Sequence, residues 1–442
     1  MQLLSSDKSP FSMVDPLTLS DDELLDRLQR AAFDYFLINY NPANGLVADT
    51  SRMGSPSSVA VVGFGLSAYP VAVERGWMTR EAAVERTLVT LRFFSNSSQS
   101  SEPDATGYKG FYYHFLDMQS GKRPWQSELS MIDTALLLAG ILTAGAYFTD
   151  RSKSESEIRQ LADALYRRVD WRWAQDRKAT LSQGWKPECG FLHYGWEGYS
   201  EASILYVLAI ASPTHSIPAN SYSAWTATYQ WENLYGHDFL YAGPLFIHQF
   251  SHAWIDFRRI QDAFMREKGS DYFENSRQAT YIQREYALRN PQDFRGYGEN
   301  FWGLSAGDGP TPGRLRIDGI ERRFFGYTAR GVPYGADDGT IAPPATLASI
   351  VFAPEMALAA IRHFCSQYPE MVNEYRLPSG FNPTLARNGS RGWISDGYFG
   401  LDQGIVVLMI ENYRSQLTWN LMRQCPYIGT GLRYADFRGG WL

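Results

Sequence analysis

The chain has 442 residues, of which 44% are hydrophobic and 20% are charged, and its formal net charge is −6. This composition excludes a disordered or collagen-like chain, and a mildly acidic chain without blocks of Lys and Arg argues against nucleic acid or an anionic membrane as a partner. Aromatic residues are frequent at 15%, with 13 Trp and 27 Tyr, which favours a surface that handles carbohydrate.

Helical periodicity predicts a first helix that begins after Ser20, which can cap it, and continues through Leu24 and Phe36 to a break at Pro42. Further helices are predicted over residues 59–73, 83–94, 129–148, 158–173, 202–211, 246–264, 276–288, 354–364 and 402–422. Short strands are predicted near 111–115 and 314–328.

The predicted helices alternate between nearly all-apolar segments, such as 129–148, and amphipathic ones, such as 158–173. An all-apolar helix is buried on every side, whereas an amphipathic helix keeps one face in water. We therefore expect an all-α fold with an inner and an outer layer of helices, closed into a toroid. No long linker divides the chain, so we expect one domain over 1–442, with 1–20 as an N-terminal extension.

The N-terminus has no basic start followed by an apolar run, and no stretch approaches about 18 uncharged apolar residues, so neither a signal peptide nor a transmembrane helix is expected. As written, the chain is expected in the cytoplasm, or in the periplasm or outside the cell if a leader precedes it. Its three scattered cysteines fit neither a disulfide framework nor a zinc motif.

The segment 185–241 holds 13 aromatic residues in 57, many of them in glycine-punctuated loops. Rings on loops can stack on the apolar faces of sugars, although they can also simply fill the mouth of a barrel. Within this segment Glu201 lies at the start of a predicted helix, near Trp196 and Tyr199. Burial there would raise the pKa of Glu201 and suit it to act as a general acid, while the helix N-terminus opposes this and a plain helix-start role stays open.

Two other carboxyl groups stand at unusual places. Asp133 interrupts an otherwise apolar helix, so it must be paired, hydrogen-bonded or exposed to a cavity. Asp402 precedes another apolar run and can be a cap or a residue at the mouth of the barrel. Asp308 and Asp338 occur in glycine-rich loops, which suits either sugar binding or simple turn chemistry.

Other chemistries find little support. His248 and His252 have the spacing of two metal ligands on a helix, but without the glutamate of a metalloprotease motif, and we expect no metal. Cys189 and His193 lie close together in the sequence, which is the only support for a catalytic Cys–His pair. No nucleotide-binding or serine-hydrolase motif is present, and no cofactor is expected.

Ten segments in order resemble the glycoamylase-like domain family, which includes the bacterial β-1,2-glucanases of glycoside hydrolase family 144. The resemblance extends from about residue 24 to about residue 422 and is carried by GLVADTSR, SSVAVVGFGL, GFYYHFLD, SMIDTALLLAGIL, GYSEASILYVLAIASPTH, GPLFIHQFSHAWIDFR, ENFWGLSAGDGP, PYGADDGTIAPPA, FAPE and LDQGIVVLMIENYR. It implies an (α/α)6 barrel with small β or irregular loop elements at the cleft mouth. It also implies hydrolysis of β-1,2-linked glucan, with endo action or release of sophorose.

The resemblance implies roles for two residues: Glu201 matches the expected general acid, and Asp133 matches an acidic residue of the family's inner helix. For the base of an inverting mechanism that needs no cofactor, the candidates are Asp133 and then Asp402. The remaining candidates bind the glucan substrate, by stacking (Trp196, Tyr199, Trp302, Tyr334) or by hydrogen bonds to hydroxyl groups (Glu197, Asp308, Asp338).

Two departures from the family pattern leave alternatives open. Ser130 stands where the glucanases tend to carry Asp, and the stretch GFNPTLAR lacks the acidic residue that the family has after GF. The missing acidic residue leaves open a catalytically impaired glucan-binding protein. Two further alternatives have other grounds: the family's older glucoamylase label implies hydrolysis of α-glucan, and a polysaccharide lyase can use the same toroid. The acidic character of the aromatic loops argues against the lyase, since a lyase would bind uronic acids through Arg and Lys.

Overall fold

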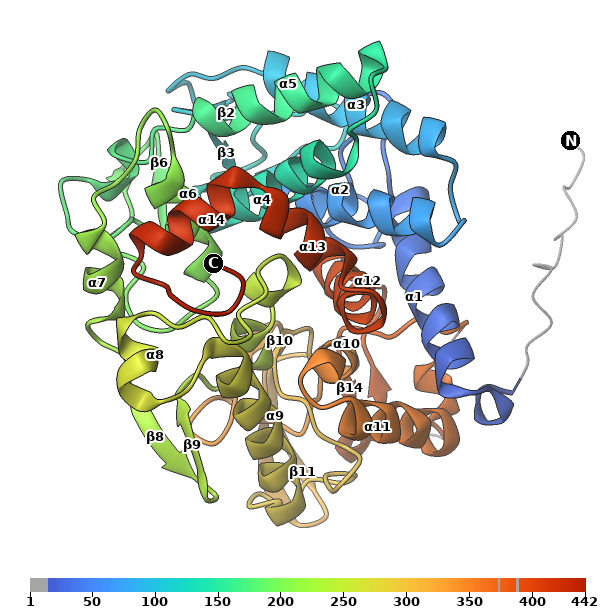
Figure 1. Cartoon of the computed structure of the whole chain (residues 1–442). Coiled ribbons are helices and arrows are strands. Elements are labelled where there is room, and N and C mark those ends of the chain that lie inside the picture. Colours follow the sequence, from blue (N-terminus) through green and yellow to red (C-terminus); the bar gives the residue numbers. More distant parts are fainter. Residues whose placement is uncertain (1–14, 373, 387–388) are drawn as a thin grey trace, which may run out of the picture.

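The computed structural model describes residues 15–372, 374–386 and 389–442. Residues 1–14 of the predicted N-terminal extension therefore lie outside the described part of the chain. The fold is mainly helical, with short strands in the connections (Figure 1). The α-helices are α1 (Asp21–Ile38), α2 (Val59–Glu74), α3 (Arg80–Asn96), α4 (Met131–Tyr147), α5 (Lys153–Arg167), α6 (Ser203–Ala211), α7 (Asn220–Thr226), α8 (Ala263–Lys268), α9 (Tyr272–Arg289), α10 (Pro343–Ala348), α11 (Pro354–Gln367), α12 (Gly400–Arg414), α13 (Leu417–Gln424) and α14 (Pro426–Tyr434).

The helices begin where local chemistry stabilises their first turn. Ser20 and Glu23 form a reciprocal capping box at α1, and Thr79 and Ser130 cap α3 and α4 with their hydroxyl groups. The all-apolar helices α4 and α6 are buried along almost their whole length, whereas α5 buries one stripe and exposes the rest. The predicted distinction between buried and amphipathic helices is therefore confirmed for these elements.

The buried helices pack against one another around the centre of the molecule. Helix α2 packs against α4 and α12, α4 against α6, and α12 against α10. Between α6 and α10 the chain forms two 3-10 turns, η3 (Leu245–His248) and η4 (Ser251–Ala253). The Gln249 side chain between these turns donates a hydrogen bond to the Ala345 carbonyl oxygen of α10 at 2.7 Å. In Figure 1 helix α12, in orange-red, lies beside α1, in blue, against which it packs, whereas α13 packs against α4 and α14 against α6.

Helices α2 and α4 approach each other closely through two glycines. A Cβ added at Gly140 would lie 2.0 Å from the Gly63 carbonyl oxygen, and one added at Gly63 would lie 2.3 Å from the Leu136 carbonyl oxygen. Neither position has room for a side chain, because the obstructing atoms are backbone. The two helices are therefore held in backbone contact.

The strands occupy the connections between helices. They are β1 (Ser57–Ser58), β2 (Gly107–Tyr108), β3 (Phe111–Tyr113), β4 (Phe115–Leu116), β5 (Leu129–Ser130), β6 (Gly184–Lys186), β7 (Gly190–Phe191), β8 (Trp231–Leu234), β9 (His237–Leu240), β10 (Ala306–Gly307), β11 (Gly313–Ile317), β12 (Ile320–Phe324), β13 (Thr328–Ala329), β14 (Phe381–Asn382) and β15 (Trp393–Ile394). Five of them form an antiparallel sheet in the order β2-β3-β5-β6-β7, in which Tyr112 pairs with Ser130. Strand β5 leads directly into α4, so its pairing with β3 and β6 fixes the position of the start of that helix.

Three helix predictions need correction. The predicted helix 246–264 is instead η3, η4, an irregular segment and the short α8, so its apolar periodicity reflects burial rather than continuous helix. The predicted helix 402–422 is broken between α12 and α13, where Gln416 has the left-handed backbone angle φ of 61°. The predicted helix 158–173 begins earlier, at Lys153, and ends at Arg167.

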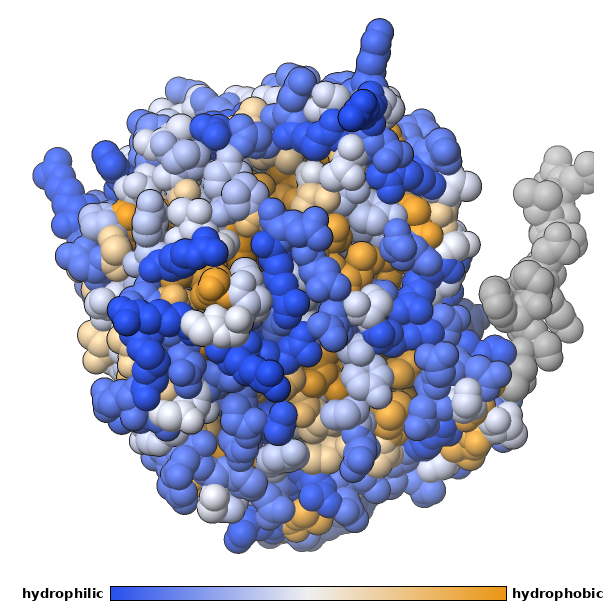
Figure 2. Space-filling model, in the orientation of Figure 1, coloured by the Kyte–Doolittle hydropathy of each residue, from blue (hydrophilic) through white to orange (hydrophobic). Residues whose placement is uncertain are grey.

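The surface in Figure 2 is mainly hydrophilic, with smaller hydrophobic areas between the charged residues. Within the part of the chain that the structure describes, no helix combines the length and apolar composition needed to cross a bilayer. All three cysteines are free thiols, and Cys365 and Cys425 are buried.

Candidate active site

A cavity of about 700 Å³ opens at the N-terminal ends of three buried helices. Asp133 lies in the first turn of α4, Glu201 lies just before α6, and Asp402 lies in the first turn of α12. The cavity brings these three carboxyl groups together, although they lie far apart in the sequence. Apolar side chains such as Ile132, Phe246 and Ile405 complete much of its wall.

Glu201 is enclosed by the protein and faces the cavity. This burial raises the pKa of Glu201 to about 7, and the nearby Asp133 adds to the rise. A hydrogen bond from the backbone N–H of Glu201 to its own carboxylate acts in the opposite direction. A carboxyl group with this pKa holds its proton through part of the neutral range, as a general acid must. The Glu201 carbonyl oxygen accepts a hydrogen bond from Ser251 at 2.8 Å, which holds the backbone at the start of α6.

Asp402 is the second carboxyl group with a strongly shifted pKa. Burial raises its pKa to about 7, a hydrogen bond with Ser379 opposes the rise, and Asp49 and Asp308 increase it. Its Oδ2 atom is buried and has no hydrogen-bond partner among the described residues. Buried carboxylate oxygens are normally paired, so an unpaired one at a cavity wall is available to a water molecule or a ligand.

Asp133 is held more tightly. The hydroxyl group of Ser130 donates to the Asp133 carboxylate and accepts a hydrogen bond from the Asp133 backbone N–H at 3.2 Å. On its other side, His114 Nε2 lies 3.7 Å from Asp133 Oδ1. Ser130 is thus both the N-cap of α4 and the partner of the acidic residue one turn into it.

His114 lies between two carboxylates of the cavity wall. Its Nδ1 lies 2.9 Å from Glu128, and its ring stacks on Phe115 with centroids 3.9 Å apart. Burial disfavours the charged ring, but Asp133 and Glu128 outweigh it and raise the pKa of His114 to about 9. His114 is therefore an imidazolium at neutral pH and offsets part of the negative charge around the cavity.

Asp49 was not predicted as a site residue, although it lies in one of the segments that carry the family resemblance. Asp49 lines the cavity, and burial raises its pKa to about 6, with His114 opposing and Asp133 adding to the rise. His114, Glu128 and Tyr327 also line the cavity and were missed. Their loop positions gave no periodic signal, and only the fold brings them together.

One wall of the cavity is formed by residues 305–307, together with Tyr327 and Ala329. The Tyr327 ring stacks on Phe399, with centroids 6.1 Å apart, and both residues line the cavity. Near this wall, Asp308 forms an ion pair with Arg52 and accepts a hydrogen bond from Ser395 at 2.9 Å. Asp308 itself does not line the cavity, so its charge acts on Asp402 from outside the wall.

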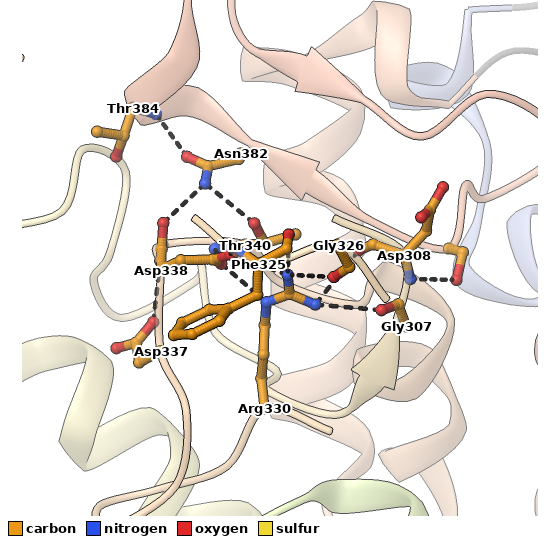
Figure 3. Close-up of polar contacts among 12 residues, drawn as sticks. Gly307, Asp308, Phe325, Gly326, Arg330, Asp337, Asp338, Thr340, Asn382 and Thr384 are labelled. Atoms are coloured by element: carbon orange, nitrogen blue, oxygen red, sulfur yellow. Dashed lines mark hydrogen bonds and ion pairs between the residues drawn. The ribbon is translucent and has the colours of Figure 1, made fainter. Parts of the chain in front are cut away.

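Behind this wall lies a buried ion pair between Arg330 and Asp338, shown in Figure 3. Arg330 donates to the Asp338 carboxylate at 2.8 and 2.9 Å and to the carbonyl oxygens of Gly307, Phe325 and Gly326. The Phe325 N–H in turn donates to Asp338 at 3.0 Å. This pair therefore holds together the two loops that carry Tyr327 and Asp308.

The other predicted binding residues are dispersed. Trp196 lines the cavity. Trp302 and Asp338 are fully buried and do not line it, so neither presents an exposed surface to a sugar. Glu197, Tyr199 and Tyr334 also lie outside the lining, and Tyr334 is largely exposed to solvent.

The stretch that departs from the family pattern lies behind the cavity. Asn382 is buried and donates to the Asp338 carbonyl oxygen and to Thr340, and it accepts a hydrogen bond from the Thr384 N–H (Figure 3). Pro383 and Leu385 are also buried, and none of these residues lines the cavity. These residues therefore contribute no side chain to the cavity wall.

The two predicted candidate metal ligands have other partners. His248 Nε2 lies 3.0 Å from the Ala242 carbonyl oxygen, and His252 Nε2 lies 3.1 Å from the Ser276 hydroxyl group. Burial lowers the pKa of His248 to about 4 and that of His252 to about 3, so both are neutral at pH 7. Within the described ranges, no group of three or more His, Cys, Asp or Glu side chains is arranged to hold a metal ion.

The chain is similar to one protein family and to several known proteins. The model of the glycoamylase family, described as "Putative glucoamylase", matches residues 193–426. An exo β-1,2-glucooligosaccharide sophorohydrolase (non-reducing end) from Parabacteroides distasonis is 28% identical over 94% of this chain. The chain spans 58% of the length of that relative.

Two solved structures are similar over nearly the whole chain. A protein from Bacteroides uniformis, described as a putative glucoamylase, has a TM-score of 0.85 and 32% identity, with 96% of this chain and 99% of that chain covered. An endo-β-1,2-glucanase from Chitinophaga pinensis, in complex with sophorotriose and glucose, has a TM-score of 0.82 and 28% identity, with 96% of this chain and 100% of that chain covered.

Proposed function

The chain belongs to the glycoamylase family, and on that premise we propose that it is a glycoside hydrolase that cleaves β-1,2-linked glucan, by endo action or by release of sophorose. The observation that carries this proposal is a cavity in which two carboxyl groups, Glu201 and Asp402, both have pKa values raised to about 7. Glycosidic cleavage needs one carboxyl group that donates a proton and one carboxylate opposite it. Relatives named as β-1,2-glucan hydrolases support the choice of substrate.

Glu201 is proposed as the general acid. Its raised pKa keeps a proton available for the departing glycosidic oxygen, and its place beside the cavity wall residue Trp196 gives it access to a sugar.

Asp402 is proposed as the base that activates the attacking water, ahead of Asp133. The unpaired Oδ2 atom of Asp402 supports this choice, because a base needs a free lone pair to accept the proton. Asp133 is engaged by Ser130 and His114 and is better suited to bind a hydroxyl group of the substrate. The reaction then inverts the anomeric configuration.

An (α/α)6 barrel is the proposed arrangement of the helices. The contacts α2–α4–α6 and α10–α12–α2, with η3 and η4 between α6 and α10, support an inner ring of six elements. Helices α1, α3, α5, α14, α9 and α11, each partly exposed, pack against these inner elements and form the outer layer of the proposed barrel. In that arrangement the cavity occupies one mouth of the ring.

The test compares linear β-1,2-glucan with soluble starch as substrates for wild type, Glu201→Gln, Asp402→Asn and the control Glu355→Gln. Glu355 is an exposed glutamate in the first turn of α11, away from the cavity. We expect cleavage of the β-1,2-glucan only, a loss of at least about 1,000-fold in the two cavity variants and no loss in the control. Chromatography of the products separates sophorose release from endo action, and NMR of fresh product reports the anomer.

Each alternative has a distinct result. Cleavage of starch alone would replace the proposal with α-glucan hydrolysis, which the description of the family model favours. Tight binding of β-1,2-glucan by folded wild type without new reducing ends would indicate a glucan-binding protein.

A further inference from the structure

Trp125 is the aromatic residue that lies one ring beyond the cavity wall. Its ring centroid lies 5.6 Å from that of Phe115, which lines the cavity and stacks on His114. The Trp125 residue is 65% exposed. A continuous series of rings therefore leads from the charged cluster at Asp133 to open solvent.

The backbone of Trp125 is in an unfavourable conformation. Its φ angle of 38° lies in the left-handed region, which bulky residues rarely occupy. Because the residue is largely exposed, its ring contact with Phe115 offsets only part of this cost. A ligand that covers the ring would supply the missing stabilisation.

The loop that carries Trp125 is firmly held by Arg123. The Arg123 side chain is only 1% exposed and forms an ion pair with Glu188 at 2.7 Å. It also donates to the Ser127 carbonyl oxygen, and its guanidinium lies 4.7 Å from the centre of the Tyr113 ring. Trp125 therefore lies on a loop whose backbone is already held in place by Arg123. Little conformational entropy of this loop is lost when a ligand binds.

We propose that Trp125 is a stacking platform for a glucose unit of the glucan chain that extends out of the cavity past Phe115. This inference rests on the proposed function and deepens it, because it assigns a residue that makes the enzyme prefer longer chains. The apolar C–H face of a pyranose is the chemistry that fits an exposed, rigid indole face. Glu128, three residues along the same loop, links this platform to His114 inside the cavity.

The platform predicts an effect that depends on substrate length. A chain that fills the cavity but does not reach Trp125 gains nothing from the indole, whereas a longer chain binds it equally in the ground and transition states. Such uniform binding lowers KM and leaves kcat unchanged. One stacked ring corresponds to an about three- to tenfold change in KM.

The experiment measures kcat and KM for wild type, Trp125→Ala, Trp125→Phe and Tyr434→Ala, each on long linear β-1,2-glucan and on the shortest oligosaccharide that wild type cleaves. Tyr434 is a matched control, since it is 62% exposed, ends α14 and does not line the cavity. We expect an about three- to tenfold higher KM of Trp125→Ala for the long substrate only, with kcat retained and with Trp125→Phe close to wild type. Thermal unfolding of each variant verifies that it is folded.

An equal KM of wild type and Trp125→Ala on long glucan would overturn the platform and leave the proposed function intact. An equal rise in KM on both substrates would also overturn it, because the indole would then act inside the cavity or on the fold. If wild type cleaves no β-1,2-glucan, direct titration with the long glucan decides: binding weakened by Trp125→Ala but not by Tyr434→Ala supports the platform without hydrolysis, and absence of binding overturns both proposals.

Discussion

The Nε2 atom of His114 lies 3.7 Å from a carboxylate oxygen of Asp133. This contact places a cation inside a cavity that otherwise gathers acidic groups. The charged groups that face His114 are Asp133 from α4, Glu128 before β5 and Asp49 after α1. The imidazolium therefore keeps several carboxyl groups in the cavity from repelling one another fully.

His114→Asn should narrow the pH range of activity. The imidazolium lowers the pKa of Asp49, so its removal raises that pKa. At low pH a smaller fraction of the Asp49 carboxyl group is then ionised. We expect an about tenfold lower kcat at pH 5 and a smaller loss at pH 8. His215→Asn is the control, because His215 is exposed and pairs loosely with Asp170, 3.9 Å away. A uniform loss at every pH would contradict the electrostatic role.

The same substitution should change stability with a defined sign. The pKa of His114 is raised from 6.5 to about 9 in the folded protein, so its stabilising contribution is complete below pH 6.5 and is lost as pH rises through about 9. His114→Asn should therefore lower the denaturation midpoint at pH 6 much more than at pH 10. Chemical denaturation of both proteins at the two pH values measures this difference.

Glu201→Gln and Asp402→Asn should stabilise the fold at neutral pH while they abolish activity. The raised pKa values mean that the folded state binds more protons than the unfolded state between about pH 4 and 7, so each acid lowers stability as pH rises through that window. A neutral amide removes this cost, and we expect a gain of about 1 to 3 kcal/mol at pH 7.5 and almost none at pH 4. Unfolding curves at the two pH values would contradict this if the gain were equal.

Ser130→Ala should affect both stability and catalysis. Loss of the N-cap of α4 costs about 1 kcal/mol, and loss of the donor to Asp133 loosens that carboxylate. Ser152 is the matched control, because it caps α5 through the same kind of bond to Glu155 but lies away from the cavity. We expect both variants to lose similar stability, and only Ser130→Ala to lose about tenfold in kcat. If Ser130→Ala had the same kcat as the Ser152 control variant, the role of Ser130 would be only to cap α4.

Asp338→Ala should strongly destabilise the protein, since it leaves the buried Arg330 without its carboxylate. We expect a loss of about 3 to 5 kcal/mol in unfolding free energy. Glu321→Ala breaks the pair Arg314–Glu321, whose side chains are 70% and 67% exposed, and should change stability by less than about 1 kcal/mol. Denaturant titration of the two variants compares them directly.

Much of the fold could be predicted from sequence because its helices carry strong local signals. The cap at Ser20, the apolar runs of α4 and α6 and the strands near 111–115 and 314–328 lie where expected. The prediction of one helix over 246–264 was wrong because the apolar residues of this segment are buried in short turns and irregular chain. Their spacing only resembles that of a helix. The short helices α7 and α14 contain too few turns to show a period.

Asp133, Glu201 and Asp402 could be singled out from the sequence because each interrupts or begins an apolar helix, and all three line one cavity. Their catalytic roles stay predictions. Loops gave no such signal, because their sequence carries no sign of what faces a cavity. Asp338 and Trp302 have the residue types of a binding site but are used in the core, and Asp49 and His114 have no local pattern yet line the cavity. Only the packing of distant elements separates these cases.

The backbone contact between Gly63 and Gly140 has a consequence for the dimensions of the active site. Where helices meet through side chains, a rotamer change can absorb a small displacement, whereas backbone atoms in contact have no such freedom. Helices α2 and α4 therefore keep a fixed position relative to each other. The end of α4 that carries Asp133 is fixed relative to α2 in the same way. A methyl group added at Gly63 or Gly140 would push the two helices apart and so displace the end of α4 that carries Asp133, although the change lies away from the cavity.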